Sequence, residues 1–227
     1  MMVEDGNIEV LKLLSSTSSI IAQGEILQLQ HKGEVDMLEE TYLKIISSKT
    51  AELFAAATKV GAILSEMKTK EKEALEFYGR NLGLTFQIAD DTLDYNSELK
   101  LFGKNIGQDF YEGKITLPII LLFQKANKDE KETLKKTFAK EERNQNDLNY
   151  TLSLIKKYDI INSCYQKAKH YINLSSNSLS VFKDSEEKNI LENLTSFSLS
   201  RNFSVSYTHL RAHETLRYLV CRLLLEK

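Results

Sequence analysis

Apolar positions recur every three or four residues along most of this chain, the spacing that places them on one face of an α-helix. This spacing predicts a helix over residues 7–30 and a second helix over residues 37–64. A third long helix is predicted over residues 71–95. No segment of useful length alternates between apolar and polar positions as a half-buried strand would. The pattern therefore predicts an all-α helical bundle.

Residues 96–114, NSELKLFGKNIGQDFYEGK, interrupt the helical pattern with polar residues and three glycines. Connections of this length are uncommon inside compact domains, and those that occur are often functional. The next helix is predicted to begin near Pro118, where the missing backbone N–H of proline costs little. The segment Asp184–Glu187, DSEE, is typical of a capping box at the start of a later helix.

Composition limits the classes of protein to which the chain can belong. Its 227 residues are 42% hydrophobic and 27% charged, which is enough chain for one sizeable globular domain. The formal net charge of −2 argues neither for nor against a nucleic-acid or membrane partner. No apolar run reaches the roughly 18 residues of a membrane-spanning helix, and the first ten residues lack the features of a signal peptide. Cys164 and Cys221 provide no disulfide framework, which fits a reducing cytoplasm.

Three aspartates stand in the otherwise apolar helical stretch FQIADDTLDY at residues 86–95. Asp90 and Asp94 are four residues apart and Asp91 and Asp94 are three apart, so on a helix all three are expected to project toward one side. Like charges at this spacing repel, and no lysine or arginine stands within a turn to relieve them. A multivalent cation is the natural compensation, so this cluster is predicted to bind a metal ion.

Cationic residues accompany the aspartates. Lys104 lies in GKNIGQD and Lys114 in EGKITLP, and Lys49 precedes Thr50 in the second predicted helix. Magnesium bridges carboxylates to phosphate oxygens, while lysine supplies point charges to the remaining oxygens. The succession of DDxxD, GKxxGxD and EGKxTLP in one short stretch therefore indicates a phosphate-ester ligand.

Four segments together resemble the trans-polyprenyl diphosphate synthases: FQIADDTLDY, GKNIGQDFYEGKITLP, YLKIISSKTAELFAAA and GEILQLQ. Within that family the chain is most similar to the long-chain enzymes of octaprenyl or decaprenyl type, which make the side-chain precursors of quinones. The resemblance covers essentially all of residues 2–203, and its motifs are specific. It implies an isoprenoid-synthase-type helical bundle around a central cavity.

The resemblance also implies a chemistry. An allylic diphosphate ionises, the double bond of isopentenyl diphosphate attacks the carbocation, and a proton is lost, while Mg²⁺ stabilises the departing diphosphate. On this sequence Asp90 and Asp91 would be magnesium ligands, and Asp94 would complete the second aspartate-rich motif of the family. The other residues implied are Lys49, Thr50, Gln87 and Lys104 as catalytic residues, and Lys49, Gln87, Lys104, Lys114 and Gln28 as substrate-binding residues.

The resemblance sets the expected partners and location. The partners are an allylic diphosphate and isopentenyl diphosphate, and neither nucleic acid nor stable membrane insertion is expected. A homodimer is implied by the resemblance alone, because buried and interface faces of a helix look alike in sequence. Ubiquinone biosynthesis in the cytoplasm is the expected setting.

Both ends of the chain depart from this resemblance. The family has two facing aspartate-rich motifs, whereas this sequence contains one, and MMVEDG at residues 1–6 resembles the point at which a helix after the first motif ends. We therefore expect an N-terminal truncation, with residues 1–204 forming the C-terminal two-thirds of a synthase domain that is inactive alone. Residues 205–227, which include VSYTHLRAHET and LVCRLLLEK, resemble translated sequencing-adaptor DNA and are expected to be a non-native tail.

Other classes of function are open on sequence alone. A non-catalytic subunit of a heteromeric prenyl synthase would use these helices as a partner interface. That alternative predicts a degraded second motif, whereas DDTLD and both following lysines are intact. A terpene cyclase shares the ionisation chemistry but gives no reason for the GKxxGxD and EGKxTLP loop. A purely structural bundle leaves the aspartates unexplained.

Overall fold

The structure is a computed structural model that describes residues 6–96 and 106–203. Every regular element in these two ranges is helical, which confirms the predicted all-α fold class. In chain order the elements are α1 (Ile8–Gln30), α2 (Glu39–Ile46), η1 (Ser47–Ala51), α3 (Glu52–Leu64), α4 (Thr69–Leu93), α5 (Gln108–Glu112), α6 (Leu117–Lys125), α7 (Lys128–Phe138), α8 (Gln145–Lys157), α9 (Ile160–Ser178), η3 (Leu179–Val181) and α10 (Glu186–Phe203). Residues 205–227, predicted to be a non-native tail, lie outside the described residues.

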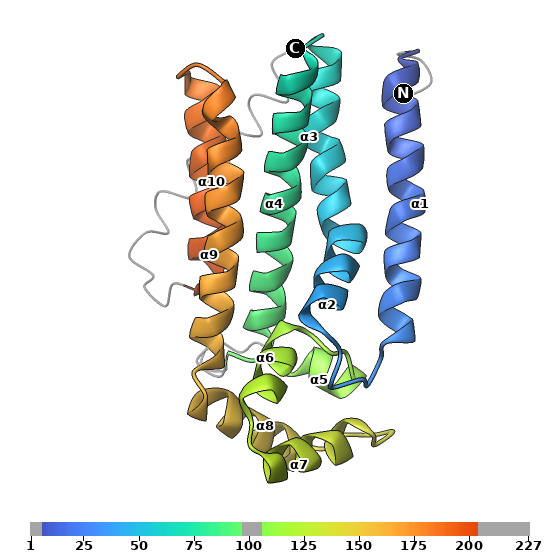
Figure 1. The fold of residues 1–227 in the computed structure, drawn as a ribbon, viewed down its shortest axis with the longest axis vertical. Helices are drawn as coiled ribbons and strands as arrows, with labels where there is room; N and C mark the ends of the chain where they lie inside the picture. The colour runs from blue at the N-terminus through green and yellow to red at the C-terminus, as the bar shows by residue number, and fades with distance from the viewer. Residues whose placement is uncertain (1–5, 97–105, 204–227) are drawn as a thin grey trace.

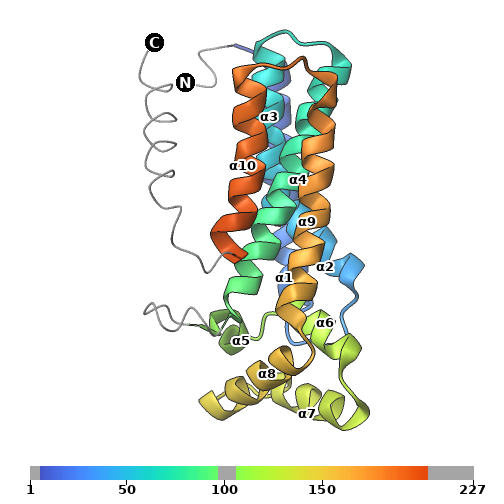
Figure 2. The ribbon, with the colours of Figure 1, turned by 90° about the vertical axis from the view of Figure 1, so that its left-hand side faces the viewer.

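The long helices α1, α3, α4, α9 and α10 run side by side along the longest dimension of the molecule (Figure 1). Helix α4 makes its most extensive contacts with α3 on one side and α9 on the other. The shorter helices α5 to α8 gather at the end of the bundle where α4 finishes, and α10 lies beside α9 (Figure 2). The aspartate segment at the end of α4 therefore lies at the junction between the long helices and the short ones.

Small residues allow α3 and α4 to approach closely. Ala55 and Ala56 are almost completely buried, whereas Ala57 is exposed. On the facing helix, a Cβ atom added at Gly79 would overlap the carbonyl oxygen of Phe54. The absence of a side chain at this glycine therefore sets the distance between the two backbones.

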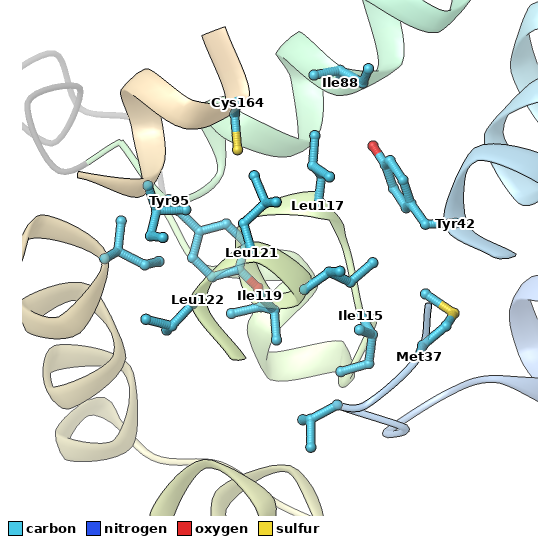
Figure 3. Close-up of a cluster of buried hydrophobic side chains, with 14 of the residues drawn as sticks. Met37, Tyr42, Ile88, Tyr95, Ile115, Leu117, Ile119, Leu121, Leu122 and Cys164 are labelled. Carbon is cyan, nitrogen blue, oxygen red and sulfur yellow. The ribbon is translucent and has the colours of Figure 1, made fainter. Parts of the chain in front are cut away.

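The main apolar core lies beneath the end of α4 (Figure 3). Helix α6 supplies much of it, because Leu117, Ile119, Ile120 and Leu122 are completely or almost completely buried. Pro118 occupies the first turn of this helix, as predicted. Among the residues that the structure describes, no helix combines the length and apolarity needed to cross a membrane.

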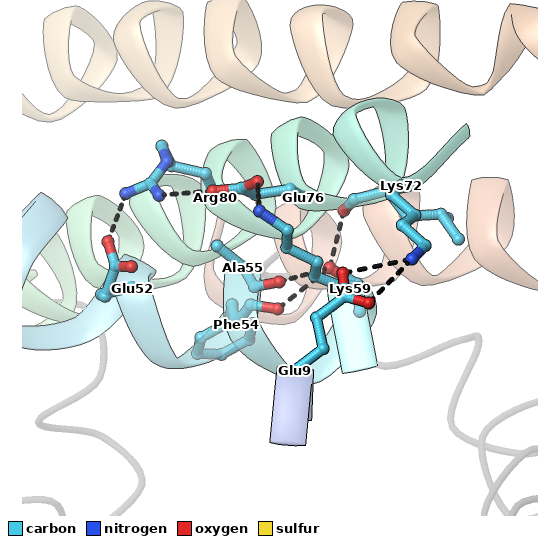
Figure 4. Close-up of polar contacts among 10 residues, drawn as sticks. Glu9, Glu52, Phe54, Ala55, Lys59, Lys72, Glu76 and Arg80 are labelled. Carbon is cyan, nitrogen blue, oxygen red and sulfur yellow. Dashed lines mark hydrogen bonds and ion pairs between the residues drawn. The ribbon is translucent and has the colours of Figure 1, made fainter. Parts of the chain in front are cut away.

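Ion pairs tie α3 to α4 along the side of the bundle (Figure 4). Arg80 donates to Glu52 with an Nη1–Oε2 distance of 2.6 Å, and its second nitrogen lies 3.4 Å from Glu76. Lys59 of α3 pairs with the same Glu76. Pairs with this partial exposure contribute modestly to stability, so their main effect is to fix the alignment of the two helices.

One helix start and one connection refine the sequence predictions. Ser185, within the DSEE segment, accepts a hydrogen bond from the backbone N–H of Lys188 at the start of α10, so the segment provides a side-chain cap, but from Ser185 and without the glutamate partner of the predicted capping box. The prediction of an irregular connection over residues 96–114 is wrong at its end, because that segment contains the short helix α5. Gly107 and Gly113 flank α5 in left-handed conformations. Because these two glycines interrupt the helical pattern on both sides, apolar periodicity does not predict this short helix.

Candidate active site

The segment that carries Lys49 and Thr50 is a π-helical turn, η1, inserted between α2 and α3. The prediction of one regular helix over residues 37–64 is wrong at this point. The backbone N–H of Glu52 bonds to the carbonyl oxygen of Ser47, five residues earlier, so the turn holds one residue more than an α-helical turn. Turns of this kind occur mostly at functional sites, where they redirect side chains.

Two glycines make room for this wide turn. A Cβ atom added at Gly24 of α1 would lie 2.6 Å from the backbone nitrogen of Lys49. On the opposite side, a Cβ atom added at Gly83 of α4 would lie 2.6 Å from the Cα atom of Ala51. The turn is therefore held between α1 and α4 by direct backbone contact, which fixes the starting points of the Lys49 and Thr50 side chains.

Lys49 reaches back to α1. Its Nζ atom lies 2.6 Å from Oε1 of Gln28 and 2.7 Å from Oε2 of Glu25. Two of the predicted substrate-binding residues, Lys49 and Gln28, are thus direct neighbours. Glu25, which the sequence prediction did not include, neutralises the lysine in this structure.

Thr50 begins a chain of hydrogen bonds that leads into the aspartate cluster. Its hydroxyl donates to Oε1 of Gln87 at 2.8 Å, and Nε2 of Gln87 donates to Oδ1 of Asp91 at 2.7 Å. The second carboxylate oxygen of Asp91 accepts a hydrogen bond of 2.7 Å from the hydroxyl of Tyr42 on α2. Three predicted site residues are therefore connected, together with a tyrosine that was not predicted.

Asp91 is almost completely buried, and this burial dominates its electrostatics. Burial raises the pKa of the carboxyl to about 7, and the charges of Asp109 and Asp90 act in the same direction. The hydrogen bonds from Tyr42 and Gln87 oppose the shift. The carboxylate is thus held in place at an electrostatic cost that a nearby cation would relieve.

The three predicted metal ligands point to different surroundings. The side chain of Asp90 is exposed and forms no hydrogen bond or ion pair with another described residue, whereas Asp91 is turned into the protein. Asp94 is directed toward the start of α5. Over residues 6–96 and 106–203, no three Asp, Glu, His or Cys side chains form a group that could hold a metal ion. Protein donors hold the carboxyl groups of Asp91 and Asp94 in this structure, and metal binding by the three aspartates stays a prediction.

Asp94 caps the short helix α5. Its Oδ1 atom accepts hydrogen bonds from the backbone N–H groups of Gly107 at 3.1 Å and Gln108 at 2.9 Å, and its Oδ2 atom accepts one from Asp109 at 2.9 Å. Partial burial and the charge of Asp109 raise the pKa of Asp94, while these backbone donors oppose the shift. Asp94 thereby attaches the segment after the cluster to the end of α4.

Lys114 is paired within the same segment. Its Nζ atom lies 3.1 Å from Oδ1 of Asp109 and 2.7 Å from Oε2 of Glu112. Burial works to lower the pKa of Lys114, but the hydrogen bond to Glu112 and the charge of Asp109 outweigh it and hold the pKa above its ordinary value. Lys114 is therefore a firmly charged group beside the fourth aspartate of the region. Lys104, the remaining predicted residue, lies outside the described residues.

Sequence reasoning missed Tyr42, Asp109 and Glu25. Asp109 stands in the quoted GQD segment, and its place in that motif is the sequence signal that could have found it. In the structure its charge acts on both Asp91 and Asp94. Tyr42 lies on the helix that precedes Lys49, where a tyrosine at helical spacing is typical of a core residue. Its pairing with a carboxylate is visible only in three dimensions.

The sequence of this chain is similar to that of known proteins. Residues 1–155 match the family described as polyprenyl synthetase. The chain belongs to this family. It is 45% identical over 120 residues to octaprenyl diphosphate synthase from Escherichia coli (strain K12), a match that covers 53% of this chain and 37% of that protein.

Solved structures share the fold of this polyprenyl synthetase family member. A decaprenyl diphosphate synthase from Rhodobacter capsulatus matches with a TM-score of 0.84 and 33% identity over 88% of this chain and 62% of that one. A polyprenyl synthase from Caulobacter crescentus CB15, complexed with calcium and isoprenyl diphosphate, matches with a TM-score of 0.83 and 37% identity over 88% of this chain and 61% of that one. The chain thus spans less than two thirds of the length of each of these relatives.

Membership of the polyprenyl synthetase family confirms the resemblance drawn from the motifs, and the structural matches confirm the isoprenoid-synthase type of helical bundle. The roles of individual residues are a separate matter. Lys49, Thr50, Gln87 and the aspartates occupy one connected region, and their assignment to catalysis, substrate binding and metal binding stays a prediction.

Proposed function

We propose that this chain forms the part of a polyprenyl diphosphate synthase that binds an allylic diphosphate, with Mg²⁺, for condensation with isopentenyl diphosphate. The observation that carries the proposal is the hydrogen-bonded connection of Thr50 on η1 to Asp91 on α4 through Gln87, with Lys49 next to Thr50 on the same turn. Elements far apart in the sequence thereby bring a cationic side chain and a carboxylate cluster to one region. The E. coli and R. capsulatus relatives, named as octaprenyl and decaprenyl diphosphate synthases, support the long-chain assignment.

The chemistry of the carboxylates fits a divalent cation. The charges of Asp90 and Asp109 raise the pKa of Asp91, and the charge of Asp109 also raises that of Asp94, so added positive charge would be stabilising. Carboxylate oxygens are the ligands that Mg²⁺ prefers in proteins, and each oxygen of Asp91 and Asp94 can accept more than one contact. We assign Asp90, Asp91 and Asp94 to the cation. Bound there, Mg²⁺ would supply Lewis-acid stabilisation of a departing diphosphate.

The protein side chains would divide the remaining work. Lys49 would exchange its ion pair with Glu25 for diphosphate oxygens, which bind ammonium groups strongly. Gln28 would then keep the lysine correctly placed. Lys114, with Lys104, would supply further positive charge beside the aspartates. Thr50 and Gln87 would direct oxygen atoms at positive charge that develops on the allylic carbon, in the manner of other preorganised dipoles.

The setting is also part of the proposal. We assign the product to the side chain of a quinone such as ubiquinone, as the resemblance to the long-chain enzymes implies, and the location to the cytoplasm, which the buried free thiol of Cys164 supports. We assign a homodimer as the working state. Ile8, Ile26 and Leu29 of α1 are each more than half exposed, which favours an apolar contact along this helix.

Binding of geranyl diphosphate to the purified 227-residue chain tests the proposal. A filter-retention assay with the labelled compound is expected to show saturable binding in the presence of Mg²⁺ and none in the presence of a chelator. Binding that ignores the metal, or no binding in either condition, would contradict the proposal. Addition of isopentenyl diphosphate is expected to give no elongated product, in accordance with the expectation that the chain is inactive alone.

A further inference from the structure

Tyr42 is the one member of the hydrogen-bonded chain to which neither the sequence nor the comparisons assign a role. It lies on α2, its side chain is almost completely buried, and its hydroxyl is directed toward α4 (Figure 3). The Oη atom lies 2.7 Å from Oδ2 of Asp91. The Tyr42 hydroxyl is the donor in this contact.

The hydrogen bonds of the chain give the Gln87 amide one orientation in this structure. The Tyr42 hydroxyl and the NH₂ group of Gln87 each donate to a carboxyl oxygen of Asp91. With its NH₂ group toward Asp91, Gln87 must present its carbonyl oxygen to Thr50. The Thr50 hydroxyl is then the donor in that contact, and its remaining capacity is for accepting only.

The orientation has a consequence for the ligand. A threonine that already donates its proton to Gln87 has no proton left for a diphosphate oxygen. Its lone pairs, and the second lone pair of the Gln87 carbonyl, suit a partner that carries positive charge. The two residues therefore match the carbon centre of an ionising allylic group better than its diphosphate.

We propose that Tyr42 is a positioning residue: by donating to Asp91 it fixes the Gln87 amide, and through it the Thr50 hydroxyl, in the orientation that accepts developing positive charge. The purpose of this orientation rests on the proposed prenyl-transfer function. The hydrogen bonds that set the orientation are within the chain and need no ligand. Tyr42 touches neither reactant in this account and acts only through Asp91 and Gln87.

Nuclear magnetic resonance of the Gln87 side-chain amide tests the proposal without any ligand. Tyr42→Phe keeps the ring and removes the donor. The expected result is a shift of the Gln87 amide signals and about tenfold faster exchange of their protons with solvent, because a hydrogen-bonded partner of the amide is no longer held. Unchanged Gln87 signals in Tyr42→Phe would overturn the proposal.

Tyr78→Phe is the matched control. Tyr78 is also completely buried and lies on α4, but its hydroxyl donates to the carbonyl oxygen of Leu191 at 2.9 Å, away from the cluster. This variant is expected to lose stability without moving the Gln87 signals. Equal shifts in the two variants would show a general loosening of the bundle and would overturn the proposal.

Thr50→Val provides a second variant in case Tyr42→Phe does not fold. It removes the contact at the other end of Gln87. Asp91, held by Tyr42, still accepts the hydrogen bond from the Gln87 NH₂ group, so slow exchange of the Gln87 amide protons is expected to persist. Loss of that slow exchange would overturn the proposal. Failure of the unaltered chain to bind geranyl diphosphate would count against the proposed function alone, because the resonance measurement needs no ligand.

Discussion

Asp94 binds the backbone of Asp109: its Oδ2 atom accepts a hydrogen bond from the Asp109 N–H group at 2.9 Å, although the two carboxylates repel one another. The contact attaches the start of α5 to the end of α4. Lys114 lies 3.1 Å from Asp109 and offsets part of the negative charge that this arrangement concentrates. The segment after the aspartate cluster is therefore built onto the cluster itself.

Asp94→Ala is expected to lower the free energy of unfolding by about 2 kcal/mol, because it leaves the backbone N–H groups of Gln108 and Asp109 without their acceptor. Asp90→Ala is the matched control, since the Asp90 side chain is exposed and forms no hydrogen bond with another described residue; it is expected to change stability by less than about 0.5 kcal/mol. Urea unfolding of both variants checks this. Equal losses would show that Asp94 does not anchor α5.

The buried Asp91 predicts a pH-dependent stability in the absence of metal. Its pKa is about 7 in the folded chain against an ordinary value of 3.8, so between these values the folded state binds a proton that the unfolded state does not. The stabilising contribution of the neutral carboxyl is thus fully present below about pH 4. It is lost as the pH rises toward 7.

Unfolding of the unaltered chain and of Asp91→Asn in a chelator, from pH 4.5 to 7.5, measures this contribution. The stability of the unaltered chain relative to Asp91→Asn is expected to fall with pH by up to about 1.4 kcal/mol per pH unit. Parallel stability curves for the two proteins would contradict the raised pKa of Asp91.

The contact between Gly24 and the π-helical turn predicts a strong effect of one methyl group. Gly24→Ala places a Cβ atom 2.6 Å from the backbone nitrogen of Lys49 and is expected to cost about 2 kcal/mol of stability by overpacking. Gly61→Ala, in open space on α3, is expected to stabilise by about 0.5 kcal/mol through helix propensity. Thermal unfolding of the two variants checks the contrast. A stabilised Gly24→Ala would mean that α1 and η1 are further apart than described.

Much of the fold could be predicted from sequence because it depends on apolar spacing. The predicted start of the first helix at residue 7 and the end of the third near residue 95 agree closely with α1 and α4. The π-helical turn could not be found in this way, because one additional residue at Lys49 hardly disturbs the helical spacing of its neighbours. Its cause lies in Gly24 and Gly83, which are distant in sequence.

Most residues of the candidate site could be predicted from sequence, but the contacts between them could not. The motifs named Gln28, Lys49, Gln87 and Asp91, and the structure places these residues in two directly bonded groups joined at η1. Spacing alone could not show that Tyr42 donates to Asp91 or that the start of α5 donates to Asp94, because these donors lie on other helices. The role of Tyr42 was hidden for the same reason.

Calorimetric titration of geranyl diphosphate, with Mg²⁺, into Lys49→Met and Lys59→Met tests the central claim most directly. Both lysines are partly exposed and paired with a glutamate, but only Lys49 lies in the candidate site. Loss of a charge-assisted contact to the diphosphate is expected to weaken binding at least about tenfold in Lys49→Met. Lys59→Met is expected to bind like the unaltered chain. Equal affinities of the two variants would contradict the assignment of Lys49 and its neighbours to the diphosphate.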